Sequence, residues 1–158
     1  MKIAKILFAS AMILSICITG SEAATVKGGA VLAEVEGTVE VKPSTSKAVW
    51  VAGVANTALV VGDLIRTGKD SYATIHINQD AETINIELKS QSQLELVELS
   101  TNTATGRKKT ILSLGAGEAM FKTKNMGADS KFEVKTPTSV IEPQGSKSVF
   151  SAQVEHAE

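Results

Sequence analysis

Cysteine and aromatic residues are scarce in this chain of 158 residues. The single cysteine, Cys17, lies in an apolar run near the N-terminus, so the remainder can form neither an internal disulfide nor a thiolate metal site. With one Trp, one Tyr and four Phe, a core must consist mainly of Val, Ile, Leu and Ala. Beyond that run, no segment shows the 3.6-residue apolar repeat of an amphipathic helix. These absences exclude a disulfide-rich scaffold and a helical bundle.

A surplus of positive charge is also missing. The chain has 16 Lys and Arg against 17 Asp and Glu, a formal net charge of −1. This balance gives no electrostatic footprint for nucleic acid or for an anionic membrane surface, so we expect no nucleic-acid partner. The length suits one compact domain, which buries about two-thirds of the surface of the unfolded chain.

The first 23 residues have the pattern of a cleavable export signal. Lys2 and Lys5 precede an apolar run over residues 6–18, and small residues stand at the −3 and −1 positions before Ala24. A membrane-spanning helix needs about 20 apolar residues, and residues 19–22 end this run too early. We therefore predict cleavage between Ala23 and Ala24, a mature chain without a transmembrane segment, and a periplasmic or secreted location.

Lipid attachment at Cys17 is an alternative to simple cleavage. The site that precedes a lipid-modified cysteine needs Gly, Ala or Ser, whereas Ile16 is bulky. A lipoprotein is therefore disfavoured, and Cys17 is expected to be removed with the signal.

The mature chain shows the period-2 alternation of half-buried strands. We expect Val31, Ala33, Val35, Val39 and Val41 on one face of a strand that bulges or bends at Gly37. Residues 24–30 are expected to be a flexible lead, residues 31–154 a domain, and residues 155–158 a tail.

Alternation continues along the chain. Residues 72–78 and 84–88 put Ile and Ala on one face, and the phase slip at Val97 predicts a bulge. Trp50 is expected in the core, beneath the loop at residues 53–57. About ten short strands, separated by turn residues every 8–12 positions, predict an all-β domain that is either a β-sandwich or a β-roll.

Several segments carry a family resemblance. They are Gly62-Asp63-Leu64-Ile65-Arg66-Thr67-Gly68, a Leu-rich strand, the glycine step at residues 114–117, and Phe132-Glu133-Val134-Lys135-Thr136-Pro137-Thr138. In order and spacing they resemble the FecR domain, a module of the bacterial envelope, over about residues 37–154. The positions that carry the motif are Gly62, Asp63, Ile65, Thr67, Gly68, Phe132, Val134, Thr136, Pro137 and Gly145.

The resemblance implies a role as well as a fold. The best-known members are anti-sigma regulators with a cytoplasmic segment, one membrane span and a periplasmic part that senses an outer-membrane transporter. This chain is expected to be a stand-alone exported version, with an envelope or outer-membrane protein as its partner. The family's Val-Arg-Gly-Thr-x-Phe stretch is replaced here by Pro143-Gln144-Gly145-Ser146-Lys147-Ser148, so the arginine and the aromatic are missing.

No catalytic, cofactor or metal constellation is expected. Ser44-x-x-Lys47 matches a penicillin-binding pattern, but it follows Pro43 in a turn rather than beginning a helix. His76 and His156, the two histidines, lack partners at ligand spacing. We therefore expect a protein that is not an enzyme.

One basic cluster, Arg107, Lys108 and Lys109, lies in a predicted polar loop at residues 102–109. Such a triplet ordinarily keeps a sheet edge solvated, and here it is also a candidate partner-contact loop. The function predicted from the sequence is a protein-binding or sensing module of the cell envelope. A module that binds glycan or peptidoglycan is the alternative.

Overall fold

A computed structural model describes residues 25–27, 29–46, 49–79 and 82–155. The predicted export signal, its cleavage site at Ala23 and Ala24, and Cys17 lie outside the described residues, as do Lys47 and His156. The described part contains thirteen strands and no helix, which confirms the all-β prediction. The strands are β1 (Thr25–Lys27), β2 (Ala30–Glu36), β3 (Val39–Lys42), β4 (Val51–Ala52), β5 (Thr57–Leu59), β6 (Leu64–Thr67), β7 (Tyr72–Gln79), β8 (Glu82–Leu88), β9 (Gln93–Asn102), β10 (Lys108–Lys124), β11 (Lys131–Lys135), β12 (Val140–Ile141) and β13 (Ser148–Val154).

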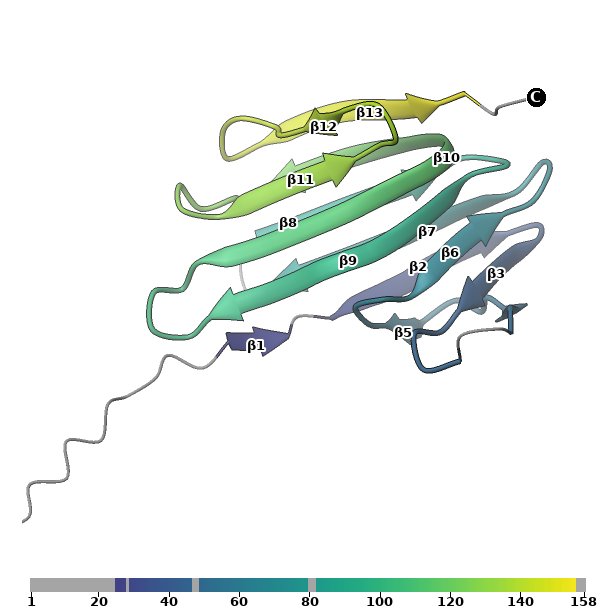
Figure 1. Ribbon diagram of the computed structural model, residues 1–158, viewed down its shortest axis with the longest axis horizontal. Helices are drawn as coiled ribbons and strands as arrows, with labels where there is room; N and C mark the ends of the chain where they lie inside the picture. Colours follow the sequence, from purple (N-terminus) through teal and green to yellow (C-terminus); the bar gives the residue numbers. More distant parts are fainter. Residues whose placement is uncertain (1–24, 28, 47–48, 80–81, 156–158) are drawn as a thin grey trace, which may run out of the picture.

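The strands form one continuous sheet that curls over into two layers (Figure 1). One layer has the order β4-β3-β6-β9-β10-β11-β12, with β1 also paired to β9. The other has the order β5-β2-β7-β8-β10-β13. Strand β10 belongs to both, because residues 108–116 pair with β9 and residues 117–124 pair with β8 and β13. The structure thus combines features of the sandwich and the roll that the sequence left open.

The core fills the space between the layers. A row of inward residues crosses the second layer from strand to strand, through Leu32, Ile75, Ile86, Phe121 and Phe150. The first four of these side chains are fully buried. The predicted inward faces of β7 and β8 are confirmed, because the alternate residues Ala73, Ile75 and Ile77 of β7 and Ile84, Ile86 and Leu88 of β8 are buried.

The predicted phase of β2 is wrong at its start. Ala30 and Leu32 are buried, whereas Val31 faces outward with 37% of its surface exposed. A register shift between Leu32 and Glu34 in the pairing with β7 then reverses the phase, so Val35 packs against the core. Gly37, with φ +73°, lies where the chain crosses from β2 in one layer to β3 in the other, and it is a bend rather than a bulge.

Part of the predicted lead forms a short strand, because residues 25–27 pair with residues 100–102 of β9. One further expectation needs correction. Trp50 was predicted in the core, yet it is half-buried and its ring lies against Arg66. By contrast, the bulge near Val97 is confirmed, because Ile111 pairs with Glu98 while Leu112 pairs with Leu96.

Candidate functional site

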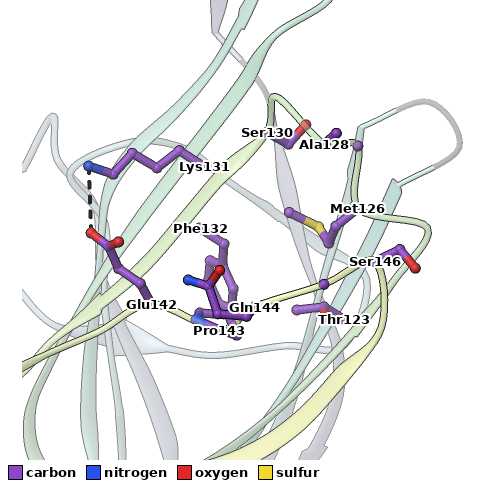
Figure 2. A pocket seen from close by; sticks show the side chains of 12 residues that line it. Thr123, Met126, Ala128, Ser130, Lys131, Phe132, Glu142, Pro143, Gln144 and Ser146 are labelled. Atoms are coloured by element: carbon purple, nitrogen blue, oxygen red, sulfur yellow. Dashed lines mark ion pairs between the residues drawn. The ribbon is translucent and has the colours of Figure 1, made fainter.

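The candidate site is a pocket of about 340 Å³ at one end of the sheet (Figure 2). It lies between the turn that joins β10 to β11 and the segment that joins β12 to β13. The lining residues are Thr123, Met126, Gly127, Ala128, Ser130, Lys131, Phe132, Glu142, Pro143, Gln144, Gly145 and Ser146. Pockets that hold small ligands begin at about 300 Å³, so this volume lies at the lower end of that range.

The pocket has an apolar base and a polar rim. Phe132 is 4% exposed and belongs to an aromatic cluster, with its ring centroid 6.1 Å from those of Phe121 and Phe150. Met126 packs against the same core and faces Phe132 across the hollow (Figure 2). Hydroxyl and amide side chains surround this base, so the surface suits a ligand with an apolar part and hydrogen-bonding edges.

Hydrogen bonds hold the two walls together. The backbone amide of Met126 donates to the carbonyl of Ser146 at 2.9 Å, and the amide of Ser148 donates to Thr123 Oγ1 at 3.0 Å. Because both bonds join one wall to the other, the pocket is pre-formed rather than assembled by a ligand.

Glu82 anchors the turn that forms the first wall. Its Oε1 accepts from the Gly127 amide at 3.0 Å and from Ser130 Oγ at 2.6 Å, and it lies 3.8 Å from Lys108 Nζ. The carboxylate comes from the first residue of β8, far from the turn in sequence. This long-range contact is why sequence patterning did not find the wall.

Lys131 lies at the edge of the pocket, and its side chain extends away from Met126 and Phe132 toward Glu142 (Figure 2). Its Nζ lies 3.6 Å from Glu142 Oε1, the ion pair drawn in Figure 2. The same Nζ contacts the Glu133 carboxylate on the outer face of β11. The hydrogen bond from Lys131 lowers the pKa of Glu133, and the same bond raises the pKa of Lys131. Lys131 and Glu142 are half-exposed, so their ion pair stabilises little and can open.

The motif residues 62–68 do not line this pocket, and their contacts are structural. Asp63 is 4% exposed, and its carboxylate accepts from the amides of Ser44 at 2.8 Å and Val60 at 2.9 Å. Thr67 Oγ1 accepts from the Ser92 amide at 3.0 Å, and the Gly68 amide donates to the Thr38 carbonyl at 2.8 Å. These hydrogen bonds connect turns to neighbouring strands, so the residues stabilise the fold.

The remaining motif positions divide between core, turn and pocket. Phe132 and Val134 are buried, and Ile65 is fully buried on β6. Thr136 closes a turn with Ser139, beside the exposed Pro137. Phe132 and Gly145 both line the pocket, so the structure brings together these two predicted positions.

The aromatic of the family's stretch falls at position 148, where this chain has Ser148. Phe150 lies two residues further along β13, on the same face as Ser148, and stacks on Phe121 with ring centroids 5.2 Å apart. Gln144 stands at the pocket rim, in the stretch where the family carries an arginine.

The predicted basic loop does not form one positive patch. Lys108 and Lys109 belong to β10, and Lys108 is buried with only 8% of its surface exposed. Lys109 Nζ lies 2.8 Å from Glu98 Oε2, and Arg107 Nη2 lies 3.8 Å from Asp129 Oδ1. The hydrogen bond from Lys109 also lowers the pKa of Glu98. Contact of this loop with a partner stays a prediction, and each of its cations already lies near a carboxylate.

Within the described ranges, no group of three or more His, Cys, Asp or Glu side chains is arranged to hold a metal ion. The same ranges contain no helix long and apolar enough to cross a membrane. His76 is half-buried on the outer face of β7, opposite Asn85 of β8.

Sequence reasoning missed Met126, Ser130, Lys131, Glu142 and Pro143 as site residues. The signal available was indirect: Gly127, Pro143 and Gly145 mark two turns. Only the pairing of β10 with both β11 and β13 shows that these turns meet.

Comparison with known families supports the resemblance seen in the sequence. The model of the family described as FecR protein matches residues 63–158, more than half of the chain. No curated protein and no solved structure matches it. The chain therefore belongs to the FecR family, whose members are sensing and regulatory modules associated with the bacterial envelope.

Proposed function

We propose that this protein is a non-enzymatic binding module of the bacterial envelope that senses another envelope protein through the pocket at Phe132. Family membership supports the sensing role and the compartment. The observation that carries the proposal is the pocket itself, with an apolar base at Met126 and Phe132 beneath a hydrogen-bonding rim.

The chemistry of the pocket favours the binding of a peptide segment over catalysis. Among the described lining residues, the ionisable side chains are Lys131 and Glu142, which lie 3.6 Å apart as an ion pair. Neither is activated by burial, since each has about half of its side chain exposed. An apolar side chain of a partner can enter over Phe132, while the partner backbone bonds to rim hydroxyls and amides.

Glycan binding, the alternative, has weaker support in the geometry. Sugars stack on exposed flat aromatic faces, and Phe132 is 4% exposed. Trp50 is half-buried and outside the pocket, with the Arg66 guanidinium over its ring at 4.0 Å.

The test is capture from an envelope extract with a photo-crosslinking amino acid in place of Gln144. We expect crosslinking to a discrete protein, which is lost when Ser146→Trp fills the pocket mouth. Val54→Trp is the control, because Val54 is 63% exposed in the loop between β4 and β5. Capture of polysaccharide alone supports the glycan alternative, and capture that survives Ser146→Trp contradicts the pocket as the site.

A further inference from the structure

Strand β13 is a sheet edge without the usual protection. Among the described strands it pairs only with β10. It runs for seven residues, Ser148–Val154, and contains no charged residue, proline or glycine. The other described strands that pair with a single neighbour are short, at three residues in β1, two in β4, three in β5 and two in β12. Soluble proteins normally shorten, charge or cover such edges, so β13 is an open template for another strand. In Figure 1 it runs along the upper margin of the molecule.

The backbone groups that face this edge can be identified from the hydrogen bonds. The Ser148 amide donates toward β10, at Thr123 Oγ1. Amides alternate in direction along a strand, so those of residues 150, 152 and 154 also face β10. The amides and carbonyls of Val149, Ser151 and Gln153 therefore point to the open side.

Strand β10 gives an independent check of this direction. The Glu118 carbonyl accepts from the Lys89 amide at 2.9 Å, and the Glu118 amide donates to Ser92 Oγ at 2.9 Å. Glu118 therefore faces away from β13, whereas its neighbour Ala119 faces Ala152. The two strands agree on which groups are left free.

We propose that β13 pairs antiparallel with β13 of a second copy of this chain, about a two-fold axis at Ser151. In this register Ser151 exchanges hydrogen bonds with its own counterpart, and Val149 does so with Gln153 of the second copy. An antiparallel pair permits a two-fold axis at such a hydrogen-bonded position. The layer that contains β13 in each copy then joins its counterpart, and the two form one continuous sheet.

Charge and packing favour this register, and they favour a second copy of the chain as the pairing partner. It places the exposed Lys147 opposite the exposed Glu155 of the second copy, once on each side of the axis. Opposite charges in directly facing positions stabilise a strand pair. Phe150, which is half-buried at the open edge, gains Ala152 of the second copy as a neighbour. The strand is thus complementary to itself in hydrogen bonds and in charge.

The experiment is sedimentation equilibrium of the purified protein from about 1 to about 200 µM. We expect a reversible dimer. Ser151→Pro removes an amide that faces the open edge and leaves the ladder to β10 intact, so it should give a monomer. Ser151→Thr is the matched control and should remain dimeric.

A charge exchange keeps the test decisive if Ser151→Pro fails to fold. Lys147→Glu and Glu155→Lys should each raise the dissociation constant by about tenfold, because each creates two like-charge pairs across the axis. The double variant Lys147→Glu/Glu155→Lys should restore the original value. A protein that stays monomeric throughout the concentration range, or a dimer that ignores both sets of changes, would overturn the proposal.

Discussion

The guanidinium of Arg66 lies over the indole ring of Trp50, with Cζ 4.0 Å from the ring centroid. The same guanidinium donates a hydrogen bond to Glu40, with Arg66 Nε 2.7 Å from Glu40 Oε2. Lys42 Nζ lies 5.9 Å from the same ring. The only tryptophan of the chain is therefore part of a polar surface cluster rather than of the core.

This stacking predicts an indole that solvent can reach. We expect Arg66→Ala to increase acrylamide quenching of Trp50 fluorescence and to lower the free energy of unfolding by about 1 kcal/mol, the usual value of an exposed cation–π contact. Glu40→Gln keeps the stack and should change stability by less than about 0.5 kcal/mol, since exposed ion pairs stabilise little. An indole that acrylamide does not quench in the unmodified protein contradicts this interpretation.

Asp63 should be the most sensitive polar residue of the first layer. Asp63→Ala leaves the amides of Ser44 and Val60 without their acceptor, and we expect a loss of about 2–4 kcal/mol in urea denaturation. Asp63→Asn keeps one acceptor oxygen and should lose less. Equal losses for the two variants would show that the carboxylate is not bonded in this way.

Gly117 and Gly106 form a matched pair of glycines with positive φ, at +78° and +67°. A Cβ at position 117 would lie 2.1 Å from Ser92 Oγ and 2.6 Å from the Gln91 carbonyl, whereas position 106 has no atom within 4 Å. We expect Gly106→Ala to cost about 1 kcal/mol, from backbone strain alone. Gly117→Ala should cost at least about 2 kcal/mol more, because strand β10 must move. Thermal unfolding of both variants measures the difference.

Lys131 should control the titration of Glu133. Lys131→Met removes the hydrogen bond that lowers the Glu133 pKa, so that pKa should rise toward its usual range. A lowered pKa stabilises the folded state above the pKa of the unfolded chain, and this contribution is lost as the pH falls through the folded value. The stability gap between the two proteins should therefore be widest near neutral pH and close in acid.

The control for this titration is Lys135→Met. Lys135 lowers the Glu133 pKa only through a weaker charge interaction, without a hydrogen bond. Its removal should therefore shift the Glu133 pKa less. Carboxyl chemical shifts followed by NMR report the pKa directly. A Glu133 pKa that responds equally to both variants would contradict the hydrogen bond to Lys131.

The phase of a strand could be predicted where apolar and polar residues alternate without ambiguity. The inward faces of β7 and β8 follow simple alternation, and they were predicted correctly. In β2, Val31 and Leu32 are both apolar, so hydrophobicity could not say which of them faces inward. The shift in pairing with β7 made that choice, and no residue type marks it.

The residues of the candidate site were likewise predictable only in part. Phe132 and Gly145 were identified by motif, but their motif neighbours at residues 62–68 fasten turns elsewhere. Lys108 belongs to a charged triplet in the sequence, yet alternation along β10 turns it inward toward Glu82. A run of like charges in a strand cannot remain one patch, because successive side chains leave opposite faces.

By itself, the sequence determined the strand-rich class, the family and most of the core, because period-2 patterning and turn residues are local signals. The tertiary structure alone decided which turns meet at the pocket, where Trp50 lies and which edge stays open. Each of these depends on pairing between distant strands, above all on β10, which joins both layers. Long-range pairing of this kind leaves no short-range trace in the residues that it brings together.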